Sequence, residues 1–360
     1  MVTICQNGPS VWLSRFPLTN LITSRQSSPT TVLCMGNKKS SMSGDNTYIR
    51  RAQHAGSWYE DEPTLLNSTL SSYMAKVHED TITTSTSNAP LRAIIGPHAG
   101  FSYSGSTAAW AYNALVQALN MEQYQANNSI TTILVLHPSH HVYLDGCAIS
   151  NATMIETPLG ILRVSQALRK ELLDSREFST MSQKTDEDEH SGELHYPYIV
   201  KACKEANVFE KIQILPIMIG GINETKEKHF GKVLASTVAR KDVITVISTD
   251  FCHWGSRFRY QPTASSGTEQ IFQHISNLDH QGMSYIELQQ PGAFAAYIKE
   301  TKNTICGRHP LSVWLHAIQH NKALGKEELQ VKFIRYEQSS QVKAMHESSV
   351  SYASAVARTV

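Results

Sequence analysis

The sequence predicts an α/β fold in one domain, with a mainly parallel or mixed central sheet and helices on both faces. Four short apolar runs are typical of buried strands, because they are β-rich and end in Gly, Pro, Ser or Asp. They span residues 91–100, 131–141, 211–221 and 242–254. Helix-length segments separate them, at residues 105–120, 196–208 and 226–240. Apolar runs without polar alternation indicate strands covered on both faces, as in parallel sheets.

The C-terminal third is less regular but contains two further strand-like runs, at residues 329–340 and 348–358. Residues 81–90 and 121–130 have the composition of surface loops. No segment between these elements looks like an interdomain linker. We therefore expect one folded domain over residues 47–360.

The N-terminal residues 1–46 are expected to be a disordered extension. Residues 1–44 contain no acidic residue, are rich in Ser and Thr, and show no sustained helical or strand period. Met42 offers an alternative start. A second interpretation is an organelle transit peptide, since such segments are rich in Arg and Ser and poor in acidic residues.

Composition and charge exclude several classes of function. The 360-residue chain is 41% hydrophobic and 18% charged, and its net charge is +1 with His neutral. Such a balance provides no basic surface for nucleic acid or an anionic membrane, and no apolar run approaches the roughly 18 residues of a membrane helix. The six cysteines are scattered, which favours free thiols over a disulfide framework.

Chemically active residues follow three of the four predicted strands. His98 follows the first, His137, His140 and His141 close the second, and Asp250, Cys252 and His253 close the fourth. Ligands in open α/β sheets bind beyond the carboxyl ends of the strands. One such His is more often a hydrogen-bonded structural residue, but three adjacent strand ends can bring imidazoles to one ion.

Two further segments are dense in functional residue types. Residues 185–197 hold five carboxylates with His190 and His195, and Thr185 is a candidate helix N-cap. This stretch is either a solvated acidic helix start or part of the surroundings of a site. Residues 303–310 contain Cys306, which alone would be interpreted as a small buried hydrophobe.

Seven motifs together resemble the Memo family, named in animals as mediators of ErbB2-driven cell motility. In order, they are AQHAGSWY (52–59), GPHAGFSYSG (96–105), HPSHH (137–141), TDEDEHSGELHYPY (185–198), STDFCHWG (248–255), NTICGRHP (303–310) and QSSQ with SSVSYA (338–353). The resemblance covers about residues 48–360. It implies a fold similar to the class III extradiol dioxygenases, the LigB-like enzymes, which hold non-haem iron.

The resemblance also implies roles for individual residues. His98, His140 and Cys306 match the metal ligands. His253 matches the acid/base residue of the dioxygenases, and Asp250 is expected to orient it. The other residues expected around the pocket are His141, His190, His195, Cys252 and Trp58.

The ligand types narrow the chemistry. Cys306 stands where the dioxygenases have a carboxylate, and a thiolate with imidazoles suits copper, zinc or differently held iron. Ring cleavage is therefore not expected. The resemblance implies copper or iron with redox consequences, zinc being an alternative. It further implies signalling through phosphotyrosine-containing receptor segments or adaptor proteins, in the cytoplasm and also in the nucleus.

Two other functions stay open on the sequence. One is an adaptor that binds phosphopeptides without catalysis, since Arg257, Arg259 and Arg308 adjoin the pocket motifs and could pair with phosphate. Ordinary surface ion pairing explains the same arginines. The other is a zinc hydrolase, which has suitable ligand types but no evident general-base Glu motif.

Overall fold

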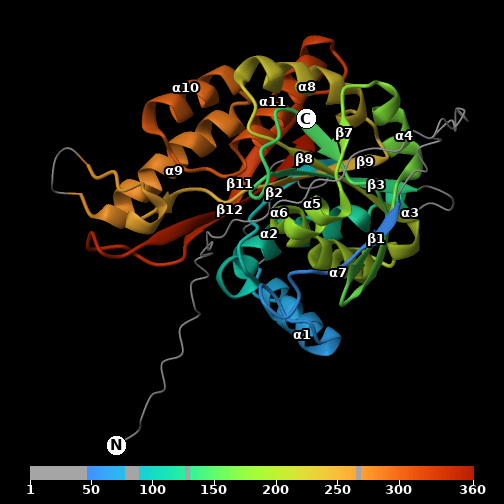
Figure 1. Cartoon of the computed structure of the whole chain (residues 1–360), viewed down its shortest axis with the longest axis horizontal. Coiled ribbons are helices and arrows are strands. Elements are labelled where there is room, and N and C mark those ends of the chain that lie inside the picture. Colours follow the sequence, from blue (N-terminus) through green and yellow to red (C-terminus); the bar gives the residue numbers. More distant parts are fainter. Residues whose placement is uncertain (1–46, 78–88, 126–129, 265–268) are drawn as a thin grey trace, which may run out of the picture. The chain divides into compact units, whose positions relative to one another are not determined.

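A large mixed sheet runs through the computed structural model, which describes residues 47–77, 89–125, 130–264 and 269–360 (Figure 1). All of these residues belong to one unit, spanning 45–360, and the α/β prediction is confirmed. The expected extension 1–46 and most of the expected loop 81–90 lie outside the described residues.

Four parallel strands form the centre of the sheet in the order β8-β3-β9-β2. They are β2 (Leu91–Gly96), β3 (Thr131–Pro138), β8 (Ile212–Ile219) and β9 (Val243–Ser248), and each matches one predicted run. In register, Ile133 of β3 lies between Ile214 of β8 and Ile244 of β9. Nearly every residue of the four strands is buried, as expected of apolar runs without alternation.

The remaining strands extend the sheet on both sides and make it mixed, in the order β1-β5-β6-β8-β3-β9-β2-β12-β10. They are β1 (Tyr48–Arg50), β4 (Cys147–Ile149), β5 (Ala152–Thr157), β6 (Gly160–Val164), β7 (Ser179–Thr180), β10 (His253–Trp254), β11 (Leu329–Gln338) and β12 (Ser349–Thr359). Strand β12 runs antiparallel to β2, β10 and β11, which confirms the two late strands.

Helices cover both faces of the sheet (Figure 1). On one face lie α1 (Pro63–Met74), α2 (Phe101–Leu119) and α7 (Tyr196–Glu205), and on the other α8 (Glu224–Val238) and α11 (Arg308–Ala323). The others are α3 (Glu122–Gln125), α4 (Gln166–Asp174), α5 (Gln183–Asp188), α6 (His190–Glu193), α9 (Ile271–Glu287) and α10 (Pro291–Thr301), with 3-10 turns η2 (Phe209–Lys211) and η3 (Ser256–Phe258). Among the described residues, no helix combines the length and apolarity that crossing a bilayer requires.

Three local predictions need correction. Helix α2 begins at Phe101, directly after Gly100, four residues earlier than the predicted segment 105–120. The N-cap of α5 is Ser182, whose hydroxyl accepts from the Thr185 amide, so Thr185 lies inside the helix. The expected loop 121–130 contains the short helix α3.

Candidate metal centre

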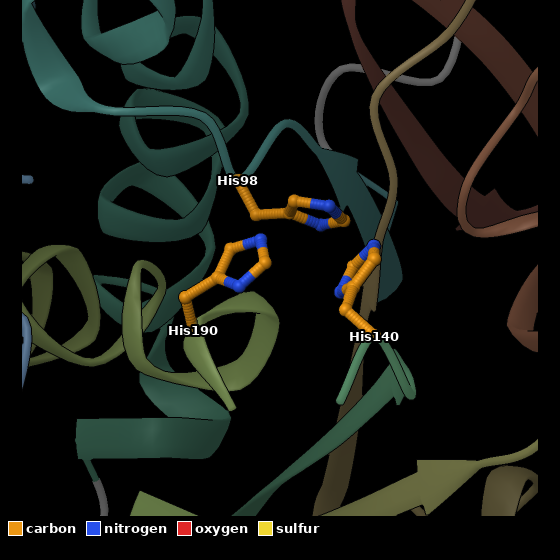
Figure 2. A group of neighbouring side chains, drawn as sticks. All are labelled: His98, His140 and His190. Carbon is orange, nitrogen blue, oxygen red and sulfur yellow. The ribbon is translucent and has the colours of Figure 1, made fainter. Parts of the chain in front are cut away.

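Imidazoles from separate segments meet beyond the carboxyl ends of β2 and β3. His98 follows β2, His140 follows β3, and His190 begins α6; their rings turn toward one space (Figure 2). Their nearest ligand nitrogens all lie within 4.8 Å of one another. His98 also belongs to a second such group, with Asp250 and Cys306. His98 is therefore common to both sets of possible ligands.

The hydrogen bonds around His98 fix its proton on Nδ1 and leave the lone pair on Nε2, where a metal could bind. His98 is buried, and its Nδ1 lies 2.6 Å from the Ser248 hydroxyl. That hydroxyl donates its only proton to the Ser191 carbonyl at 2.7 Å, so Nδ1 must be the donor to it. Burial lowers the pKa of His98 well below its ordinary value, and neighbouring imidazoles lower it further. The ring is therefore neutral, with its lone pair on Nε2, as a metal ligand requires.

His140 has a similar arrangement with a buried carboxylate. Glu189 Oε1 lies 2.8 Å from His140 Nδ1, and Oε2 accepts from the His140 backbone amide at 2.6 Å. Burial would raise the pKa of Glu189, but its hydrogen bond with His140 and the neighbouring histidines outweigh burial and lower the pKa. The carboxylate is thus ionised and holds the proton on Nδ1, which leaves Nε2 of His140 as the ligand atom.

His190 is held by ring stacking. Its ring lies between Trp58, at a centroid distance of 4.4 Å, and His140, at 4.5 Å. The His140 and His190 planes are 26° apart, whereas His98 and His140 meet at 75°. Since a lone pair lies in its ring plane, stacked rings direct their nitrogens alongside each other. For His190 to share an ion with His140, one of these rings must turn.

Cys306 approaches His98 from the loop before α11. Its Sγ lies 3.2 Å from His98 Nε2 and accepts from the Asp250 amide at 3.1 Å. Zn–N and Zn–S bonds of about 2.1 and 2.3 Å place such atoms about 3.6 Å apart on a tetrahedral ion, so a small shift would admit one. Gly307 permits this approach, because a Cβ there would lie 2.3 Å from the Ser248 carbonyl oxygen.

The thiol of Cys306 is protonated without a metal, because burial raises its pKa and the Asp250 charge adds to the effect. Metal binding would displace this proton, as is general for cysteine ligands. Asp250 is itself buried, and burial raises its pKa to about 7. Its carboxylate accepts from the His98 amide at 2.8 Å and so fixes the backbone that carries a candidate ligand.

Asp250 does not orient His253, contrary to expectation. The carbonyl oxygens of Phe251 and Thr304, at 2.9 and 3.0 Å, hold Nδ1 of His253. A carbonyl only accepts, so Nδ1 carries the proton. Burial lowers the pKa of His253, which favours a neutral ring with an unprotonated Nε2.

The other expected pocket residues have different environments. Trp58 and His190 line the site through their stacking, and the exposed His141 lies 5.9 Å from the His190 ring. His195 is fully buried against Tyr112, whose hydroxyl lies 2.8 Å from its Nδ1. Cys252 is also fully buried, so neither His195 nor Cys252 presents its side chain to a ligand at the surface.

Sequence reasoning missed the residues that orient the candidate ligands. Ser248 was visible only as the end of a strand, and Glu189 only as one of five carboxylates in an acidic stretch. The available signal was only the presence of carboxylates near candidate metal-binding His residues, because such His residues usually donate to a carboxylate. Nothing in the sequence indicated which of the five carboxylates is buried.

Comparison with known proteins identifies the family. The family described as Memo-like protein matches residues 50–356. The chain belongs to the Memo family.

Memo relatives match over nearly their whole length. Protein MEMO1 of Homo sapiens and of Rattus norvegicus are each 42% identical over 305 residues, covering 84% of this chain and 95% of the relative. Protein memo-1 homolog of Caenorhabditis elegans is 36% identical, covering 88% of this chain and 85% of the relative. A crystal structure of an uncharacterized Escherichia coli protein, JW3007, aligns with a TM-score of 0.44 at 13% identity, covering 72% of this chain and 98% of that one.

Replacing Glu189 by Gln should weaken metal binding by this Memo chain about 10- to 100-fold, the usual effect of losing a carboxylate behind a His ligand. An amide is a weaker acceptor and no longer favours one tautomer of His140. Competition titration with a chelating dye measures the affinity. Glu187→Gln is the matched control, because Glu187 contacts Gln183 and the Arg51 amide instead. Equal affinities for both variants would remove Glu189 from the account.

Proposed function

We propose that this Memo-family chain binds a redox-active metal, copper or iron, through His98, His140 and Cys306. The observation that carries the proposal is the shared geometry of the two imidazoles. Each has its Nδ1 proton held by a buried acceptor, Ser248 or Glu189, so that Nε2 is the candidate ligand atom of each ring. The Cys306 thiol lies 3.2 Å from one of these nitrogens.

The ligand types favour copper, iron or zinc over magnesium or calcium. A thiolate with two imidazoles suits Cu(I), Zn(II) and Fe, whereas magnesium and calcium prefer oxygen. A bound copper or iron would supply one-electron chemistry at the pocket. The chain's own residues would hold the ion, shield it and handle protons, with His253 as the candidate proton donor or acceptor.

The stacked His190 lies beside the proposed ligands without adding charge there. Trp58 and His140 hold its ring beside the proposed ligands, and the His190 side chain is 12% exposed. Burial lowers the pKa of His190 to about 3, so the ring adds no positive charge near an arriving cation at neutral pH. This absence of charge favours cation binding.

His253→Ala should reduce any metal-dependent turnover about 100- to 10,000-fold, the usual loss for an acid/base group. The metal content should stay unchanged, since Nδ1 of His253 is committed to two carbonyls outside the proposed ligand set. Oxygen consumption with a reductant measures turnover, and elemental analysis measures the metal. Wild-type turnover in this variant would exclude His253 from proton transfer.

A second candidate, a phosphopeptide adaptor, is favoured by one cavity beside the centre. It has a volume of about 360 Å³, and Trp58, Tyr103, Arg257 and Tyr352 are among its lining residues. The Arg257 guanidinium could pair with a phosphate, and the aromatic rings could contact a tyrosine. On this proposal, the chain acts in cytoplasmic receptor tyrosine kinase signalling and cell motility.

Two substitutions distinguish the metal-binding function from the phosphopeptide-binding function. Arg257→Ala should weaken binding of a phosphotyrosine peptide and leave metal content unchanged, whereas Cys306→Ser should do the reverse. Arg259→Ala is a suitable control, because Arg259 is exposed and does not line this cavity. If wild-type protein has no measurable peptide affinity, the adaptor function is excluded.

A further inference from the structure

A buried carboxylate behind the candidate centre joins two loops of that centre. Asp279 lies in α9 and is fully buried. Its Oδ1 accepts from the Cys252 backbone amide at 3.2 Å and from the Asn303 side-chain amide at 2.9 Å. Its Oδ2 accepts from the Tyr336 hydroxyl at 2.9 Å. One oxygen atom therefore connects the segment after β9 with the segment that leads to Cys306.

The two joined segments also bond directly to each other. The Thr304 hydroxyl accepts from the His253 amide at 2.7 Å and lies 3.0 Å from the His253 carbonyl oxygen. Further along, the Asp250 amide donates to Cys306 Sγ at 3.1 Å. The thiol position thus depends on how these loops are held together, and Asp279 holds them from the side of the core.

Loss of the Asp279 carboxylate would remove the acceptor that the two loops share. The Cys252 amide and the Asn303 side chain would lose the bond to Asp279, and an unsatisfied buried donor is costly. The loops would shift to recover hydrogen bonds. Because Asn303 is three residues from Cys306, such a shift would move Sγ relative to His98 Nε2.

We propose that Asp279 is a positioning residue of the metal centre, which sets where the Cys306 thiolate lies relative to His98. Asp279 touches none of the three proposed ligands and acts through the two loops. The inference rests on the proposed function, since it concerns the same metal. It assigns a role in metal affinity to a residue of α9, an element that supplies no ligand.

Cobalt(II) titration of the full chain tests this proposal, because cobalt reports its ligands by absorbance. A cobalt–thiolate bond gives a near-ultraviolet charge-transfer band, which should disappear in Cys306→Ser. Asp279→Ala should weaken cobalt affinity about 10- to 100-fold, as loss of outer partners of a metal site does. It should also weaken the thiolate band relative to the visible bands of the bound ion.

Three further variants distinguish a positioning role of Asp279 from a general loss of stability. Two are conservative, and the third disrupts the same link from the side of Asn303. Asp279→Asn keeps an acceptor for both loops and should restore the wild-type band. Tyr336→Phe removes the bond to Oδ2 and the hydroxyl's contacts with Ser351 and Gln338, but it leaves both loop contacts of Asp279 Oδ1 in place. It should therefore behave like wild type. Asn303→Ala removes the link to Asp279 on the Cys306 side, together with a bond to the Tyr297 hydroxyl, and keeps the bond of Asp279 to the Cys252 amide. It should reproduce the thiolate spectrum expected of Asp279→Ala, even if Asp279→Ala fails to fold.

The outcomes separate the inference from the proposed function. If Asn303→Ala and folded Asp279→Ala bind cobalt with wild-type affinity and band intensity, Asp279 has no positioning role. If unmodified protein shows no thiolate band that depends on Cys306, the metal centre itself is wrong. A weakened band in the two disruptive variants, with recovery in Asp279→Asn, supports the inference.

Discussion

Arg50→Met is expected to lower the free energy of unfolding by about 3–5 kcal/mol, the usual cost of breaking a buried ion pair. Arg50 is fully buried, with its Nε 3.0 Å from Asp186 Oδ1 and one terminal nitrogen 2.6 Å from Glu193 Oε2. Methionine fills similar space but leaves two buried carboxylates without their cation. Urea unfolding followed by circular dichroism measures the loss.

The same replacement at the surface provides the control. Arg163 pairs with Glu210, but both side chains are about half exposed or more. Exposed pairs contribute about 0–1 kcal/mol, so Arg163→Met should change stability little. A loss below 1 kcal/mol in Arg50→Met would mean that the buried network does not stabilise the fold.

The Arg50 network should also make stability sensitive to acid. Burial would raise the pKa of Glu193, but Arg50 and His54 outweigh it and lower the pKa to about 2. A carboxylate with a lowered folded-state pKa stabilises the fold above its unfolded pKa, near 4.5. This contribution is lost as the pH falls from about 4.5 to about 2. Arg50→Met should show a weaker loss over that interval.

His98→Ala is expected to reduce metal affinity by more than about 100-fold. Losing a residue that only hydrogen-bonds a metal ligand usually costs about 10- to 100-fold, and His98 is itself a proposed ligand. His98 belongs to both groups of candidate ligands, so its removal leaves neither group complete. Isothermal titration with a defined copper or iron salt under anaerobic conditions measures the affinity.

The neighbouring His141 offers the matched control for this variant. It is exposed and belongs to neither candidate ligand group among the described residues. His141→Ala should bind metal as the wild type does. If His98→Ala and His141→Ala bind equally well, the ion lies elsewhere, and the assignment of His98 fails.

The central strands were predictable because burial on both faces gives unmistakable local signals. Apolar β-branched runs predicted β2, β3, β8 and β9, and parallel pairing then explains why His98 and His140 lie close together. The short edge strands β4 and β7 escaped notice, because two or three residues carry little periodic signal.

The contacts that orient the centre depend on tertiary packing that local patterns do not contain. Asp279 is 27 residues from its partner Cys252, and nothing around it in the sequence suggests a buried acceptor. Asp250 illustrates the reverse case. Its place near His253 in the sequence suggested an orienting contact, but the chain turns it toward the His98 amide.

Metal analysis of protein purified anaerobically tests whether His98, His140 and Cys306 hold copper or iron. We expect about one equivalent of copper or iron per chain, held by one site with deprotonated ligands. His98→Ala and Cys306→Ser should each lose most of that metal while keeping the wild-type circular dichroism spectrum. Wild-type metal content in both folded variants, or unmodified protein that binds neither copper nor iron when these are supplied, would contradict the account.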